Sequence, residues 1–202
     1  MPLKGLYRLA SVAGVVAAVI LLLNAGRRGG VIPELDLTHA LAPVAEIASL
    51  FLVLGLYLSQ RQRIGIAGFV GYVLNAVGLA GLVGVEFVLN LIFPALSAAQ
   101  IDTIRHGVTG TMFTLTSLVF LVGVLVFGST LWLPNDLPRA AILLYAVGSI
   151  PIGLRGVLPV ATLVPGLILV AIGISWLSVH LWRHAPRIAE AEPQDQMFAN
   201  GG

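Results

Sequence analysis

The chain of 202 residues contains no cysteine. This absence excludes disulfides, thiolate metal sites, iron–sulfur clusters and cysteine nucleophiles. Charged residues are also scarce, because Asp, Glu, Lys and Arg together make up 10% of the chain, whereas soluble domains carry roughly a quarter. The formal net charge is only +2 and no long basic run is present. We therefore expect no nucleic acid among the partners of this protein.

Apolar residues are abundant instead, at 58% of the chain, and the mean hydropathy is +0.99. A helix needs about 20 predominantly apolar residues to cross the hydrocarbon core of a bilayer. Six segments meet this requirement: residues 6–24, 40–59, 64–93, 107–131, 139–157 and 160–182. The sequence therefore predicts an all-α fold, an integral membrane six-helix bundle.

Two of these segments depart from a simple crossing. As a straight helix, residues 64–93 would be roughly 45 Å long against a core of about 30 Å, so this segment must tilt, bend at its glycines or protrude. Because it carries Glu86 and Asn90, we expect it to be the central helix, packed by its neighbours. Residues 139–157 contain Pro151 and Arg155, which predict a kink or an early end.

Small residues recur at four-residue spacing in two segments. Ala10, Gly14 and Ala18 follow this spacing in the first segment, and Ala67 and Gly71 follow it in the third. Such patterns allow helices to approach closely. We expect them to serve packing inside the chain rather than a dimer interface, because a six-helix bundle has many internal contacts to make.

The distribution of lysine and arginine predicts the orientation, since these residues favour cytoplasmic loops. In a six-crossing topology the larger group falls on one side: Lys4, Arg8, Arg61, Arg63, Arg139, Arg183 and Arg187. The smaller group falls on the other: Arg27, Arg28, Arg105 and Arg155. We therefore expect a multi-pass protein of the cell (inner) membrane with both termini in the cytoplasm.

The chain is expected to divide into a transmembrane domain, residues 1–184, and a tail, residues 185–202. The tail is polar and contains proline, which predicts disorder on the cytoplasmic side. At the other end, Lys4 and Arg8 precede an apolar run and so resemble the start of a signal peptide. No clear small-x-small cleavage pattern follows, which favours a retained helix over a cleaved one.

The few polar residues inside the predicted helices gather in the half of the bundle that faces away from the cytoplasm. In the third segment, Asn75, Glu86 and Asn90 fall on one helical face. A buried carboxylate must be paired, protonated or hydrated, and Arg155 is the best partner for Glu86 or Glu46. The candidate binding residues are Glu46, Asn75, Glu86, Asn90, His106 and Arg155. Among them, His106 is expected to open the fourth membrane helix. These residues line an outer polar pocket or form a clasp that only fixes the helix register, and the two interpretations have similar weight.

Other site types find less support. His180 and His184 share one helix face, but no third ligand on a helix lies near enough in sequence to complete a zinc site. His39 and His106 are a weak signal for haem. No serine lies in a Gly-x-Ser-x-Gly setting. We therefore predict neither a metal nor a cofactor.

Three short motifs carry a resemblance that spans most of the chain. They are Tyr7-Arg8-Leu9-Ala10 at the start of the first helix, Leu56-Tyr57-Leu58 at the end of the second and Leu137-Pro138-Arg139 at the start of the fifth. With this order of segments, the chain resembles a family of uncharacterised bacterial six-pass membrane proteins, a domain of unknown function. The resemblance implies a fold and no catalytic residues.

Three functional classes remain open from the sequence. The leading prediction is a lipid- or partner-binding accessory protein, with membrane lipids or another membrane protein as the partner. The alternatives are a small transporter or channel entered through the outer pocket, and an intramembrane lipid-modifying enzyme, an isomerase or cyclase with Glu46 or Glu86 as proton donor. Whether the protein is an enzyme is left undecided by the sequence.

Overall fold

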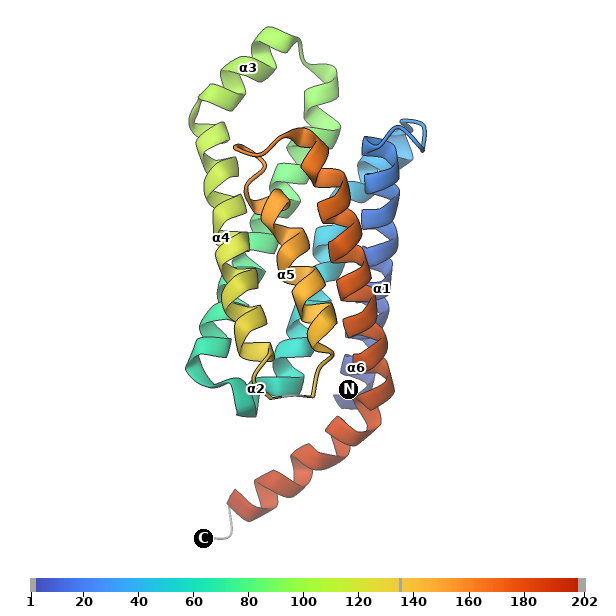
Figure 1. Ribbon diagram of the computed structural model, residues 1–202, viewed down its shortest axis with the longest axis vertical. Helices are drawn as coiled ribbons and strands as arrows, with labels where there is room; N and C mark the ends of the chain where they lie inside the picture. The colour runs from blue at the N-terminus through green and yellow to red at the C-terminus, as the bar shows by residue number, and fades with distance from the viewer. Residues whose placement is uncertain (1–2, 135, 200–202) are drawn as a thin grey trace.

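The structure is a computed structural model that describes the backbone of residues 3–134 and 136–199 and the side chains up to residue 185. Every regular element in this described part is helical (Figure 1). The six α-helices are α1 (Leu3–Arg28), α2 (Asp36–Phe87), α3 (Ala98–His106), α4 (Val108–Leu131), α5 (Arg139–Gly153) and α6 (Leu163–Ala199). Short helical turns complete the connections: η1 (Val88–Ile92), η2 (Phe93–Ala95) and η3 (Val160–Thr162). The predicted all-α class is confirmed.

Helix α2 is 52 residues long and reverses direction within its length. Gly65 interrupts it with φ 56° and ψ −158°, and Figure 1 shows the chain descending to this end of the bundle and returning. The two limbs, residues 36–64 and 66–87, correspond to the second and third predicted segments. The reversal at Gly65 lies at the second residue of the predicted segment 64–93, so it joins two segments and does not shorten the long one. The long segment continues past Phe87 into further helical turns.

Gly65 adopts a backbone conformation that is essentially restricted to glycine. An alanine Cβ at this position would meet no atom within 4 Å, so a substitution acts through the backbone alone. We expect Gly65→Ala to lower the free energy of unfolding in detergent by about 1–3 kcal/mol. Gly84 also has open space around it but lies in regular helix, so Gly84→Ala is the control and should stabilise the protein slightly. Equal effects of the two substitutions would contradict this prediction.

Glycines let the second limb of α2 pack directly on the backbone of α4. A Cβ built at Gly71 would lie 2.6 Å from the backbone nitrogen of Phe127, and one built at Gly78 would lie 2.6 Å from that of Phe120. On the other face of the bundle, α1 packs between α2 and α6, and α5 packs between α4 and α6. Gly71 therefore serves packing within the chain, as its small-residue pattern predicts.

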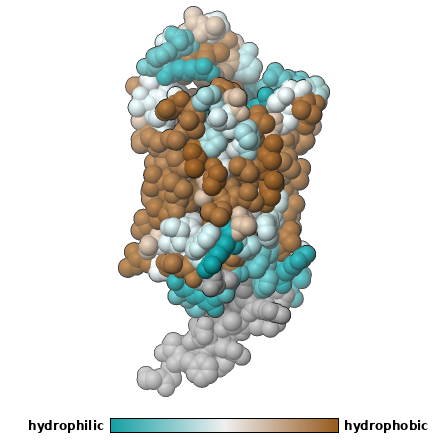
Figure 2. All heavy atoms as spheres, in the orientation of Figure 1, coloured by the Kyte–Doolittle hydropathy of each residue, from teal (hydrophilic) through white to brown (hydrophobic). Residues whose placement is uncertain are grey.

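The face of the bundle shown in Figure 2 carries a broad apolar band between two more polar ends. In the part of the chain that the structure describes, four segments are long and apolar enough to cross a membrane: Leu3–Arg28, Asp36–Ala95, Val108–Leu131 and Val160–Ala185. Helix α5 is shorter, at 15 residues, and contains Pro151. Its end at Gly153 agrees with the early end predicted for this segment.

Helix α3 is an element that we did not expect from the sequence. Ser97 caps it, since its hydroxyl accepts a hydrogen bond from the Gln100 N–H, and none of its residues is buried. His106 belongs to the last turn of α3, and Gly107 separates it from α4. The prediction that His106 opens the fourth membrane helix is therefore wrong.

The backbone of α6 is helical up to Ala199, well into the tail predicted for residues 185–202. The side chains beyond residue 185, and residues 200–202 altogether, lie outside the described part of the chain. The division into a domain and a disordered tail therefore stays a prediction.

Candidate functional site

Polar side chains from three separate parts of the chain meet around Glu86, near the end of α2. Glu86 Oε1 accepts a hydrogen bond from Arg155 Nη1 at 2.9 Å, and Glu86 Oε2 accepts one from Asn90 Nδ2 at 2.9 Å. Arg28 Nη2 approaches the same Oε2 at 3.5 Å. Only 7% of Glu86 is exposed. Of the two partners that we expected for Arg155, Glu86 or Glu46, the structure pairs it with Glu86.

Arg27 extends this cluster from the last turn of α1. Its Nη2 donates to Asn90 Oδ1 at 2.6 Å and to Asn24 Oδ1 at 3.0 Å. Its Nη1 lies 2.6 Å from Nδ1 of His39, at the start of α2. Arg27 is only 8% exposed, so this guanidinium depends on neighbouring side chains, rather than water, for its hydrogen bonds.

Local structure explains how these side chains come together. Arg27 and Arg28 occupy the last turn of α1, where cations interact favourably with the helix dipole. Asn90 lies in the π-helical turn η1, a widened turn of the kind often found at functional sites. Arg155 follows the end of α5. We call Asn24, Arg27, Arg28, His39, Glu86, Asn90 and Arg155 the arginine cluster.

Positive charge exceeds negative charge in the arginine cluster. The cluster holds three guanidinium groups, and among the residues whose side chains are described, Glu86 is the only carboxylate within ion-pair distance of any of them. Within the described residues, Nε of Arg27 and both Nε and Nη2 of Arg155 are buried without a hydrogen-bond partner. Buried donors of this kind are rare in native proteins. The cluster therefore has spare donors and spare positive charge suited to an anion.

Three of the six predicted site residues lie outside the arginine cluster. Asn75 forms a buried hydrogen bond with the hydroxyl of Tyr145 at 2.9 Å. His106 is exposed and contacts Asp102 on α3 at 3.3 Å. Glu46 faces an internal cavity instead. A single outer pocket lined by all six residues is therefore not what the structure contains.

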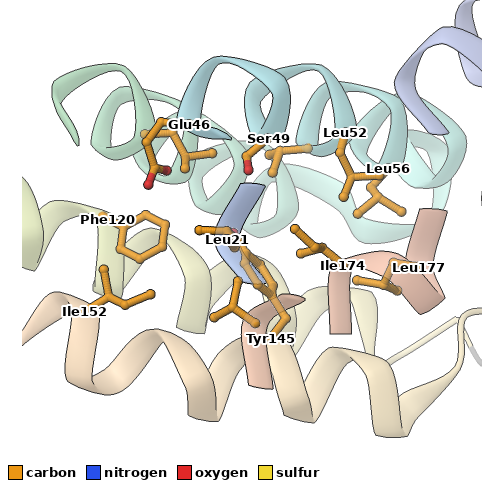
Figure 3. Close-up of a pocket in the computed structure, with 13 residues that line it drawn as sticks. Leu21, Glu46, Ser49, Leu52, Leu56, Phe120, Tyr145, Ile152, Ile174 and Leu177 are labelled. Carbon is orange, nitrogen blue, oxygen red and sulfur yellow. The ribbon is translucent and has the colours of Figure 1, made fainter. Parts of the chain in front are cut away.

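This cavity lies between the helices and is separate from the arginine cluster. Glu46 and Tyr145 border it from opposite sides (Figure 3). Its lining does not include Glu86, Asn90 or Arg155. Ser49 is the remaining polar side chain among its apolar neighbours. The space open to water-sized molecules is about 20 Å³, enough for roughly one or two waters and too small for a lipid chain.

Arg27 and Arg28 were not among the predicted site residues, because arginines at the end of an apolar segment are typical of charges that flank a membrane helix. A signal was available in the spacing of Asn24, Arg27 and Arg28, which places an amide within reach of both guanidinium groups along one helix. The contact from Arg27 to Asn90 joins residues 63 positions apart, and no local pattern predicts it.

The histidines considered for metal or haem have other partners. His39 contacts Arg27, and His106 contacts Asp102. The rings of His180 and His184 stack with their centroids 4.1 Å apart. No group of three or more metal-ligating side chains occurs among the described residues.

Comparison with known proteins gives no match: no family model, no curated protein and no solved structure is similar to this chain. The resemblance to six-pass proteins stays a prediction. Any functional conclusion therefore depends on the geometry of the chain itself.

Proposed function

We propose that this protein crosses the membrane six times and binds an anionic lipid at the arginine cluster. In this topology, α1, the two limbs of α2, α4, α5 and α6 are the crossings, and both termini lie in the cytoplasm. The apolar band in Figure 2 and the four long apolar segments support insertion in a bilayer. Helix α5 is about 22 Å long by its 15 residues, so it crosses together with the turn that follows it.

One observation carries the lipid-binding proposal: three arginines gather around a single carboxylate that pairs with only two of them, Arg28 and Arg155. In addition, Arg27 and Arg155 keep buried N–H donors without acceptors. A phosphate group accepts paired hydrogen bonds from guanidinium groups and neutralises their charge. The cluster lies at the end of the bundle where α1 ends, so a headgroup at the membrane surface can approach it while its acyl chains stay in the bilayer. The small cavity beside Glu46 offers no comparable support to the transporter or enzyme alternatives.

Native mass spectrometry of the whole protein in detergent tests the proposal. We expect an anionic phospholipid, phosphatidylglycerol, to remain bound better than zwitterionic phosphatidylcholine. In the Arg28→Gln variant, retention should fall about tenfold, because a hydrogen bond to a charged group contributes about 1.5–3 kcal/mol. Arg28 is chosen because it is the least buried of the three arginines.

Arg183→Gln is the matched control and should leave retention unchanged. Arg183 is exposed, and its neighbour Trp182 lies against Arg8 near the start of α1, whereas the cluster lies where α1 ends. Equal retention of the two lipids, unaffected by Arg28→Gln in a folded variant, would favour the alternative that the cluster is only a structural clasp.

A further inference from the structure

The internal cavity beside Glu46 is distinct from the arginine cluster and draws its walls from five helices. Helices α1, α4 and α6 contribute only apolar side chains to it: Leu21, Phe120, Val170, Ile174 and Leu177. Helices α2 and α5 contribute its three polar groups, Glu46, Ser49 and Tyr145. Figure 3 shows the Glu46 carboxyl group directed into this space.

The two membrane-level glutamates of α2 have opposite surroundings. Glu86 makes hydrogen bonds with Arg155 and Asn90 and is approached by Arg28. Glu46 has no hydrogen-bond or ion-pair partner within the described part of the chain. A carboxylate that lacks both a partner and bulk water is strongly disfavoured, and such a group takes up a proton instead.

The other polar groups at the cavity are already engaged. The Ser49 hydroxyl donates to the Ala45 carbonyl at 2.8 Å, and the Tyr145 hydroxyl pairs with Asn75. The charged groups that interact electrostatically with Glu46 are Glu86 and Arg155. The negative charge of Glu86 would repel a second negative charge on Glu46. Arg155 is not available to Glu46, because it already forms an ion pair with Glu86 at 2.9 Å. The hydroxyl protons of Ser49 and Tyr145 are both used within the protein, so neither hydroxyl can donate to Glu46, and a water admitted to the cavity is the remaining hydrogen-bond donor.

We propose that this cavity is a proton-binding site, in which Glu46 takes up and releases a proton through one or two waters held beside it. The ligand class is the proton itself, because the space of about 20 Å³ admits water and excludes larger molecules. Glu46 is neutral at neutral pH, whereas Glu86 stays ionised in its arginine pairs. This site is independent of lipid binding at the arginine cluster.

Infrared difference spectroscopy of the whole protein in lipid vesicles tests the proposal directly. A neutral carboxylic acid has a C=O stretching band that an ionised carboxylate lacks. We expect the wild type to show this band at neutral pH and to lose it at alkaline pH. In Glu46→Gln the band should be absent, and in Glu46→Asp, which keeps an acid in the cavity, it should shift.

Glu34→Gln is the control, because Glu34 is exposed outside the helices, and it should leave the band unchanged. Two results would overturn the proposal: a pH-dependent band that persists in Glu46→Gln, or a wild-type spectrum with no such band at neutral pH. If Glu46→Gln does not fold, the shift expected in Glu46→Asp decides the assignment, and an unshifted band in that variant overturns it.

Discussion

Replacing Glu86 with alanine is expected to lower the free energy of unfolding by about 3–5 kcal/mol, the range for breaking one side of a buried ion pair. The loss is large because Arg155 and Arg28 would keep their charge without a carboxylate, and Asn90 would lose an acceptor. Denaturant titration in mixed micelles, followed by circular dichroism, measures this loss.

The Arg155→Ala variant completes a double-mutant cycle with Glu86→Ala. Because the two side chains contact each other at 2.9 Å, the double variant should be destabilised by less than the sum of the two single losses, with a coupling of about 0.5–3 kcal/mol. Strictly additive losses would mean that the two side chains do not interact in the folded protein.

Replacing Gly78 with leucine is expected to lower the free energy of unfolding by about 3 kcal/mol or more, at the upper end for overpacked sites. A Cβ at Gly78 would lie 2.6 Å from the backbone nitrogen of Phe120 and 2.7 Å from its Cβ. Backbone atoms of a packed helix cannot rotate away, so α4 must move as a unit. The same titration in mixed micelles measures the loss.

Gly128 is the matched control, because a Cβ there would meet only Ile142, at an ordinary contact distance of 3.5 Å. Like Gly84, Gly128 lies in regular helix, so Gly128→Ala should stabilise the protein slightly, by up to about 1 kcal/mol. Gly78→Leu as stable as the wild type would contradict the close contact between α2 and α4. Phe120 also lines the cavity of Glu46, so a shift of α4 is expected to alter the Glu46 infrared band as well.

The candidate site was predictable only where helical spacing was enough. Glu86 and Asn90 are four residues apart on one helix. Arg155 was expected near them because the predicted topology puts the end of the third segment and the end of the fifth on the same side of the membrane. Asn75 shares their helical face but lies about three turns earlier than Glu86, where Tyr145 pairs with it. Helical spacing shows which residues share a face, but it does not show which neighbouring helix covers each turn.

The errors concern elements whose boundaries are set by capping and turns. Ser97 and Gln100 form a capping box, and this local signal was available for α3. The expectation that His106 begins a membrane helix ignored it. The cavity was not predictable, because it arises where side chains of five helices leave a gap.

The sequence by itself determined the helical class, the positions of the long apolar segments and the need to neutralise a few buried charges, because length, hydropathy and helical period are local properties. Only the tertiary structure decided which charges share a partner. It brought the arginines at the end of α1 to Glu86 and left Glu46 facing a cavity without one. The reason is physical: ion pairs and cavities depend on distances between residues that are remote in sequence, and helix packing alone sets those distances.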